Sequence, residues 1–548
     1  MRTFFTVLLG FAISTATSRG ADASVTSTTG TPPPPRDVIA RVHFAGAARI
    51  SADRNSAAFT NIFCSAEARA LEAQTLDKLA RAPGAWFTNK IAPGAGDGSA
   101  PLRPLLDDFF NSEWLLEMRE AAAGTLEYTL AIRLDSSRAA LWQNNLTGLL
   151  KSWTQLPIQT IPGGWQLKKD LPPNLFRFVR VGDWVVIGCG ENELPMTTDL
   201  TQQLAAGKPL VAPEDNNWVS ANLNWPRLAQ WFPVLGKFDF PKLDLGVMGR
   251  DGNLQLNGHF NLAQPLAPLA KWQLPDVIRS PVVSFTAVRG VGPWLARQSW
   301  AQSFEFQPPP DQFFIWAFSD LPFLTYAATP VKDTNASLVS LNSAVSAAFA
   351  RHRNNPFLSQ ISMTMTSREI LWHDVPIMTP FVQPLHEPGG DYLFGGFFQY
   401  LPGPQPLSPE LAGQLNAPNL VYYQWENTSA RLRDLPQLTQ LLLLLTQHRQ
   451  LGQDAAAQKW LDRIDPILGP SVTHATLTAP NEVTFRRTAP AGLTALELIA
   501  LATWLDAPNF PGCDLTPLPP PKRGPHPFAH PAAPVTLTAP APSPAKTK

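Results

Sequence analysis

The sequence predicts an α+β fold of two similar lobes, each built from strand-helix-hairpin units with mainly antiparallel sheets. The clearest unit covers residues 217–262. Its apolar pattern predicts, in order, a strand at 218–223, a short helix at 226–235 and two strands within 243–262. Between these two strands, Asp251-Gly252 supplies the positive backbone angles that a tight hairpin turn requires. Variants of this order of elements recur along the chain.

The first half of the chain contains two such units after a helical segment. The expected elements are a strand at 38–44, helices at 66–81 and 111–123 with a Gly-rich loop at 93–104 between them, a strand at 125–134, a helix at 137–153, and strands at 176–180 and 184–187. Ser136 or Ser137 is the expected N-cap of the helix at 137–153. Gly182-Asp183 is the expected turn of the hairpin that follows.

The second half repeats this order. Its expected strands lie at 282–288, 313–318, 360–365, 369–372, 420–425, 475–478 and 483–487, and its expected helices at 292–300, 335–351, 435–451 and 492–505. Residues 217–219 correspond best to 419–421, and the turn at 251–253 to 480–482. This correspondence favours an internal duplication. The alternative is that strand, helix and hairpin is simply a common order of elements.

The two ends of the chain differ in composition from its interior. Residues 1–23 combine a basic n-region, an apolar stretch and a small-residue cleavage site, which predicts a signal peptide; the alternative is an ordinary apolar helix. Residues 24–36 form a Pro- and Thr-rich linker. The two lobes are expected at 37–275 and 276–507, followed by a disordered Pro-rich tail at 508–548.

Charge and cysteine usage exclude several classes of partner and site. The 43 basic and 43 acidic residues balance, and no Lys or Arg run marks a nucleic-acid surface, so nucleic acid is not an expected partner. No apolar run after the signal approaches the roughly 20 residues of a membrane span. Cys64, Cys189 and Cys513 are too scattered for a zinc site. Either Cys64 and Cys189 form a disulfide, or all three are buried thiols.

Common catalytic motifs are absent from the sequence. The chain has no Gly-x-Ser-x-Gly pentapeptide and no His-Glu-x-x-His, and Pro388 breaks any helix after His386-Glu387. The Gly-rich stretch at 94–99 lacks the Lys of a phosphate-binding loop and is interpreted as a surface loop. We therefore expect no catalytic residues, no cofactor and no metal.

An acidic cluster lies near the helix expected at 111–123. Its members are Asp107, Asp108, Glu113, Glu117 and Glu120. Paired carboxylates can divide acid and base roles when their environments differ. Helical spacing, however, places the three glutamates on one face, which is typical of a solvated surface. We interpret the cluster as surface charge.

The 17 Trp residues are the strongest indication of ligand binding. A Trp ring combines a large apolar face with one polar group, so an exposed set can form a platform for apolar ligands. Trp225, Trp231, Trp294 and Trp300 lie near expected helix starts or faces and are the candidate ligand-binding residues. The alternative is that these rings belong to the core, because helices packed on sheets need large residues.

The export signal, Pro-rich ends, Trp excess and twofold α+β order resemble the large uncharacterised exported proteins of bacteria with complex envelopes. This resemblance carries no active site. We expect a non-enzymatic protein of the periplasm or cell surface, whose two lobes bind an envelope protein or an apolar ligand between them. The alternative is an envelope-acting hydrolase whose active site is assembled from residues far apart in sequence.

Overall fold

The α+β class is confirmed, with helices and strands in about equal measure. The computed structural model describes residues 38–86, 98–120, 125–169, 174–191, 193–210, 216–232, 235, 240–266, 268–302, 308–318, 324–351, 361–366, 368–375, 378–400, 403–433, 455–508 and 510–512. The helix expected at 435–451, the expected signal peptide and most of the expected tail lie outside these residues.

Most strands belong to a single sheet of 20 strands, and two short ones form a separate pair. The strands of the first half are β1 (Val38–Phe44), β2 (Trp114–Glu120), β3 (Leu126–Arg133), β4 (Gln159–Ile161), β5 (Gly164–Lys168), β6 (Leu175–Val181), β7 (Trp184–Gly190), β8 (Val219–Asn224), β9 (Lys242–Arg250) and β10 (Asn253–Asn261). The strands of the second half are β11 (Arg279–Ser280), β12 (Val282–Arg289), β13 (Gln312–Phe318), β14 (Thr325–Pro330), β15 (Ser362–Met365), β16 (Ile370–His373), β17 (Phe381–Glu387), β18 (Gly390–Gly396), β19 (Gln405–Pro406), β20 (Leu420–Asn427), β21 (Pro470–Ala479) and β22 (Glu482–Ala489).

The helices lie between strands or after the last one. They are α2 (Ala47–Ala52), α3 (Ala57–Phe63), α4 (Ala66–Trp86), α5 (Ser99–Asn111), α6 (Ser136–Thr154), α7 (Pro195–Ala205), α8 (Trp225–Trp231), α9 (Gly292–Leu295), α10 (Ser299–Gln302), α11 (Thr334–Arg351), α12 (Pro409–Gln414), α14 (Ala456–Ile464) and α15 (Ala495–Asp506), with a 3₁₀ turn at Asp465–Ile467.

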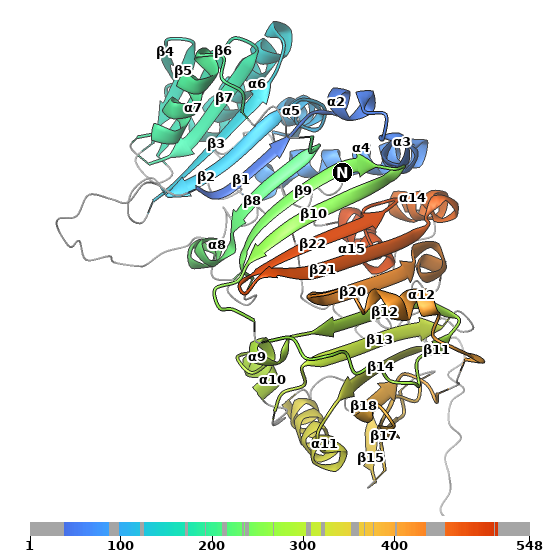
Figure 1. Ribbon diagram of the computed structural model, residues 1–548. Coiled ribbons are helices and arrows are strands. Elements are labelled where there is room, and N and C mark those ends of the chain that lie inside the picture. The colour runs from blue at the N-terminus through green and yellow to red at the C-terminus, as the bar shows by residue number, and fades with distance from the viewer. Residues whose placement is uncertain are drawn as a thin grey trace, which may run out of the picture.

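The sheet is one unbroken antiparallel ladder. Its order in space is β4-β5-β6-β7-β3-β2-β1-β8-β9-β10-β22-β21-β20-β12-β13-β14-β18-β17-β16-β15. The two halves meet where β10 pairs with β22, from Leu254 opposite Ala489 to Asn261 opposite Glu482. Strands from the end of the chain (red) therefore lie in the middle of the sheet, between β9–β10 and β12 (Figure 1).

The largest hydrophobic core lies between this sheet and helices from both halves of the chain. It joins α2 to α6 with α14 and α15, and α4 packs against both of the late helices. The Trp460 indole of α14 donates a 3.0 Å hydrogen bond to the Ile62 carbonyl of α3. Lys78 of α4 donates to the Leu505 carbonyl of α15 at 2.9 Å. The first half thus shares its core with the last helices.

The helix expected at 111–123 is wrong, because residues 114–120 form strand β2. Its glutamates at positions three and four apart imitate a helical face, but β1 and β3 pair with β2 on either side and fix the extended backbone. In the strand, Glu117 points into a buried site and is only 3% exposed. Its carboxylate lies 3.3 Å from the Arg41 guanidinium. The interpretation of these glutamates as a solvated helical face is therefore also wrong.

The Gly-rich loop expected at 93–104 is wrong in its second part, because α5 begins at Ser99. Residues 93–97 lie outside the described part of the chain. Gly98 takes the left-handed conformation before the first turn, with φ of 75°. Pro101 falls within the first turn, where its missing N–H has no helical partner to lose. Pro101 thus lies at the start of a helix, and Pro104 lies inside it.

Signals at the ends of elements predict local structure well. Asp251 and Gly252 have φ values of 49° and 75°, as the hairpin turn between β9 and β10 requires. The expected N-cap of α6, Ser136 or Ser137, is wrong, because Asp135 directly before them has that role. Its carboxylate accepts hydrogen bonds from the Ser137 and Arg138 backbone N–H groups, each at 2.8 Å. A carboxylate is as strong a cap as a hydroxyl.

Cys64 and Cys189 are free thiols, so the disulfide alternative is not adopted. Burial raises the pKa of Cys189 to about 12. We expect Cys189 to resist iodoacetamide at pH 8 in the native protein and to react in urea, because the thiolate is the nucleophile. Peptide mapping by mass spectrometry measures both reactions. Native labelling of Cys189 at the denatured rate, or blocked labelling in urea without reductant, would contradict this account.

The junction between the halves depends on close packing at Gly258 of β10. A Cβ there would lie 2.4 Å from the Phe485 ring of β22. We expect Gly258→Ala to lower the free energy of unfolding by about 1–3 kcal/mol, measured from the urea midpoint. Gly148→Ala is the matched control, because its Cβ meets nothing within 4 Å in helix α6. That variant should be more stable by roughly 0.5–1 kcal/mol.

Candidate apolar binding pocket

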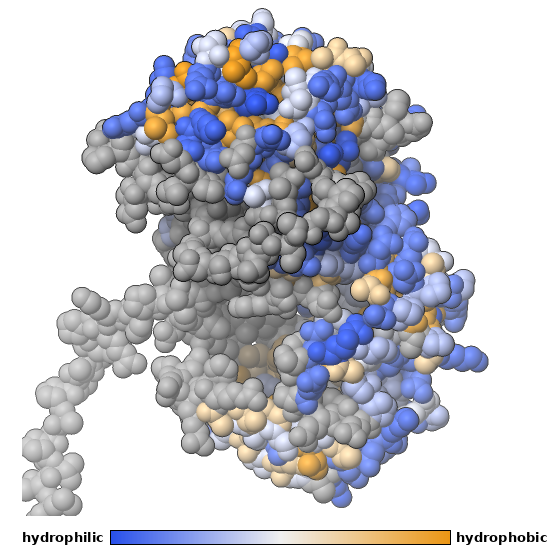
Figure 2. All heavy atoms as spheres, turned by 90° about the vertical axis from the view of Figure 1, so that its left-hand side faces the viewer, coloured by the Kyte–Doolittle hydropathy of each residue, from blue (hydrophilic) through white to orange (hydrophobic). Residues whose placement is uncertain are grey.

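A large pocket lies within the second half of the chain. Its volume is about 1040 Å³, at the upper end of the roughly 300–1,000 Å³ typical of small-molecule sites. The lining residues come from β13, β14, β16, β17 and β18, from α9, α10 and α11, and from Pro309 and Pro310 before β13. Figure 2 views the molecule from the side on which α9 and α10 lie in Figure 1, and its lower half is hollowed there.

The lining is apolar and, among the described residues, uncharged. Two of its polar side chains are engaged within the protein. Thr329 Oγ1 donates to the Gln312 carbonyl at 2.7 Å, and Gln302 Nε2 donates to the Ala296 carbonyl at 3.0 Å. The Thr325 hydroxyl is shielded from solvent without a hydrogen-bond partner in the described structure. The pocket can therefore bury hydrocarbon at little cost but offers almost nothing to a charged or strongly polar group.

Strand alternation builds the sheet side of the pocket. Tyr326 and Ala328 are each 1% exposed and pack in the core beneath β14. Successive side chains of a strand point to opposite faces, so the open face of β14 carries Thr325, Ala327 and Thr329. These three residues are small. They form a low floor along the strand, flanked by Ile315 of β13 beside Ala327 and by Leu393 of β18 beside Thr329.

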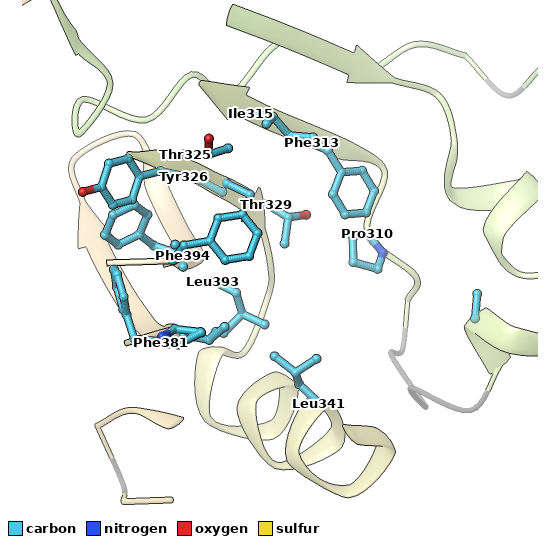
Figure 3. A pocket seen from close by; sticks show the side chains of 18 of the residues that line it. Pro310, Phe313, Ile315, Thr325, Tyr326, Thr329, Leu341, Phe381, Leu393 and Phe394 are labelled. Atoms are coloured by element: carbon cyan, nitrogen blue, oxygen red, sulfur yellow. The ribbon is translucent and has the colours of Figure 1, made fainter. Parts of the chain in front are cut away.

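Larger side chains form the walls around this floor. Phe313 comes from β13, Leu393 from β18, and Leu341 points from α11 toward Leu393 (Figure 3). Two wall residues remain open to solvent, since Ile315 is 45% and Phe397 39% exposed. Exposed apolar area costs about 25 cal/mol per Å². A hydrocarbon ligand that covered these two side chains would therefore gain free energy.

The base of the pocket, meaning the aromatic core beneath the floor strand β14, is made rigid by the packing of its rings. Phe394 stacks on Trp316 at 5.9 Å and on Tyr326 at 5.8 Å between ring centroids. Phe381 meets Phe394 edge to face at 5.4 Å. Such pairs add about 0.5–1.5 kcal/mol beyond their buried area. The base is thus formed before any ligand arrives.

A carboxylate fixes the wall that contains α9. Asp311, just before β13, accepts hydrogen bonds from the backbone N–H groups of Gly290 at 3.2 Å and Gly292 at 3.0 Å. Gly290 has φ of 78°, a conformation that glycine adopts without strain. The contact holds the start of α9 against the start of β13. It thereby positions Leu295 and the neighbouring wall residues over the pocket.

The four candidate Trp residues do not come together at one site. Trp225 and Trp231 belong to α8 in the first half, where Trp231 is 8% exposed in a small core. Trp294 is 38% exposed on α9, directly before the pocket residue Leu295. Trp300 lies on α10 beside the lining residues of that helix, and its side chain is outside the described structure.

Trp372 of β16 lines the pocket but is not among the four Trp residues predicted from the sequence. The floor along β14 was not predicted either. One signal was available, because residues 313–318 of β13 are apolar at every position, whereas a strand with one wet face alternates. That pattern indicates apolar surroundings on both faces of β13.

The acidic cluster serves the fold, because each carboxylate has a cationic partner. Asp108 lies 2.8 Å from Arg138, and Glu120 lies 2.6 Å from Arg227. Burial would raise the pKa of Glu113, but the hydrogen bond and charge of His43 hold that pKa below its ordinary value. Such pairing is the usual environment of structural carboxylates.

Within the described ranges, no group of three or more His, Cys, Asp or Glu side chains could hold a metal ion. None of the described helices is both long and apolar enough to cross a bilayer.

No protein-family model matches the chain, and no curated protein matches it. Among solved structures, the TP0453 protein in its crystal form I is similar over 44% of this chain and 100% of that chain. The sequence identity is 9% and the TM-score 0.22, too low to support an argument about fold or function.

The Asp311 contact can be tested without any ligand. We expect Asp311→Ala to speed hydrogen exchange of the backbone amides around α9 at least tenfold, because two charge-assisted hydrogen bonds of about 1.5–3 kcal/mol are lost. Asp311→Asn keeps an acceptor oxygen and should have a smaller effect. Exchange measured by mass spectrometry on peptides of α9 decides this. Equal exchange in all three proteins would contradict the positioning role.

Proposed function

We propose that this protein is an exported, non-enzymatic binding protein that holds an apolar ligand in the pocket of its second half. The observation that carries this proposal is the pocket's size combined with its uncharged lining. Ligand sites are typically concave, mostly apolar and largely preformed, and the stacked rings at the base meet the last condition. The ligand lies inside one half in this proposal, rather than between the two.

Strand order supports a duplication of the two halves as part of the same proposal. Outward from the junction, the first half runs β10-β9-β8-β1-β2-β3-β7-β6-β5-β4 and the second runs β22-β21-β20-β12-β13-β14-β18-β17-β16-β15. When the separate pair β11 and β19 is left out, each half has ten described strands. If these are numbered one to ten along the chain, both halves have the same order outward from the junction, 10-9-8-1-2-3-7-6-5-4. A helix follows the third strand in both halves, α6 in one and α11 in the other.

In this proposal the two halves differ in what covers the sheet, and that difference creates the pocket. Between β1 and β2, residues 45–113 contain α2 to α5, which pack in the large core. Between β12 and β13, residues 290–311 contain only the short α9 and α10 in the described part. The shorter cover leaves apolar sheet surface open in the second half. The first half then acts as the scaffold and the second as the binding half.

Filling the floor of the pocket tests the proposal. Ala327 is exposed at the middle of the floor, so Ala327→Trp occupies ligand space without entering the core. The uncharged fluorescent probe N-phenyl-1-naphthylamine should bind the wild-type protein. We expect Ala327→Trp to weaken its binding at least tenfold, a loss of about 1.4 kcal/mol.

Ala347→Trp is the matched control for this variant. Ala347 is an exposed residue of α11 that does not line the pocket, so the probe should bind this variant as it binds the wild type. Both variants should keep the wild-type urea midpoint, which separates a filled pocket from a disturbed fold. Equal probe binding by both variants would contradict the proposed site.

A further inference from the structure

We infer that the ligand is a long straight-chain amphiphile whose aliphatic chain lies along β14 while its polar head stays outside the pocket. This inference rests on the proposed function and adds the chemical class of the ligand. It follows from the bonding of the pocket's polar groups, the shape of its floor and the position of its open residues.

The part of the ligand inside the pocket is hydrocarbon. The polar side chains of Thr329 and Gln302 already donate to backbone carbonyls, and the Tyr326 hydroxyl donates to the Gln399 carbonyl at 3.1 Å. A polar ligand group placed here would lose its water without gaining a partner. Two exceptions lie in the described lining, the Thr325 hydroxyl and the Trp372 indole N–H, and each could pair with a single neutral atom at most. A ligand with polar groups along its length does not fit.

The aliphatic chain of the ligand is expected to be elongated because the floor of the pocket is elongated. Thr325, Ala327 and Thr329 follow one another on the open face of β14. The four steps from Thr325 to Thr329 span about 13 Å, at about 3.3 Å per residue. Phe313 and Leu393 rise on opposite sides of this row, from the two strands that pair with β14. At Thr329 these two side chains limit the width, so a straight chain can lie in this trough whereas a wide fused-ring system would rest on its walls; opposite Ala327, the β18 side carries Gly395 and is open.

The head of the ligand lies outside the trough. No described lining residue carries a charge that could pair with an ionised head, and an unpaired buried charge is far more costly than an unpaired dipole. Ile315 and Phe397 mark the open side of the pocket, where solvent reaches the walls. A head placed there remains hydrated. Its chemistry should therefore have little influence on affinity.

The test is competition with N-phenyl-1-naphthylamine on the full mature chain. Competitors are straight-chain primary alcohols of increasing length, and, at one length, the alcohol, the carboxylic acid and the lysophospholipid. The dissociation constant should fall about fourfold for each methylene that enters the trough, from about 0.8 kcal/mol per buried CH₂. The three head groups should compete equally. In Ala327→Trp, the affinity of the competitors should stop rising at a shorter chain length than in Ala347→Trp.

Each remaining outcome overturns a defined part of the account. Probe binding that is lost in Ala327→Trp but shows no dependence on chain length would overturn the straight-chain class and leave the proposed function standing. A change of more than tenfold between head groups would overturn the exposed head. Absence of probe binding to the wild-type protein would overturn the proposed function and the inference together.

Discussion

The unbroken antiparallel ladder is the constraint on which the rest of this structure depends. A strand inside a sheet must have its N–H and C=O groups paired on both sides, since a buried unpaired group costs about 1–3 kcal/mol. Pairing of β10 with β22 satisfies the inner edges of both halves at once. This pairing also brings α14 and α15, from the end of the chain, onto α4 near its beginning. The halves therefore share one sheet and one large core.

Local signals predicted local structure, and only contacts between distant segments decided the remainder. The Asp251-Gly252 turn needs positive φ values that few residues adopt, so the sequence alone identified that hairpin. Residues 114–120 carry glutamates at helical spacing, and nothing within the segment reveals that β1 and β3 hold it extended. The order of strands across the junction had no local signal either, because it depends on which edges remain unpaired after the hairpins form.

The pocket has only one signal in the sequence, the apolar run of β13, for a related physical reason. The Trp excess pointed to an apolar ligand, yet Trp316 and Trp460 are fully buried and serve packing. In the proposed account the site is open because only the short α9 and α10 lie between β12 and β13 in the described part of the chain, and a search for ligand-binding residue patterns does not detect a short cover. The floor is then formed by small residues such as Ala327 and Thr329, which belong to no ligand-binding sequence pattern. Asp311 contributes from outside by fixing α9, one of the two short helices of the wall.

The central claim is that a hydrocarbon chain lies along β14, and a crystal structure with a marked chain tests it most directly. A straight-chain carboxylic acid with a bromine at its far end gives an anomalous signal at one atom. The account predicts that signal inside the pocket, beside Ala327 and between Phe313 and Leu393, with the carboxylate in solvent. Bromine found in solvent, or a chain bound at saturation anywhere other than this trough, would contradict it.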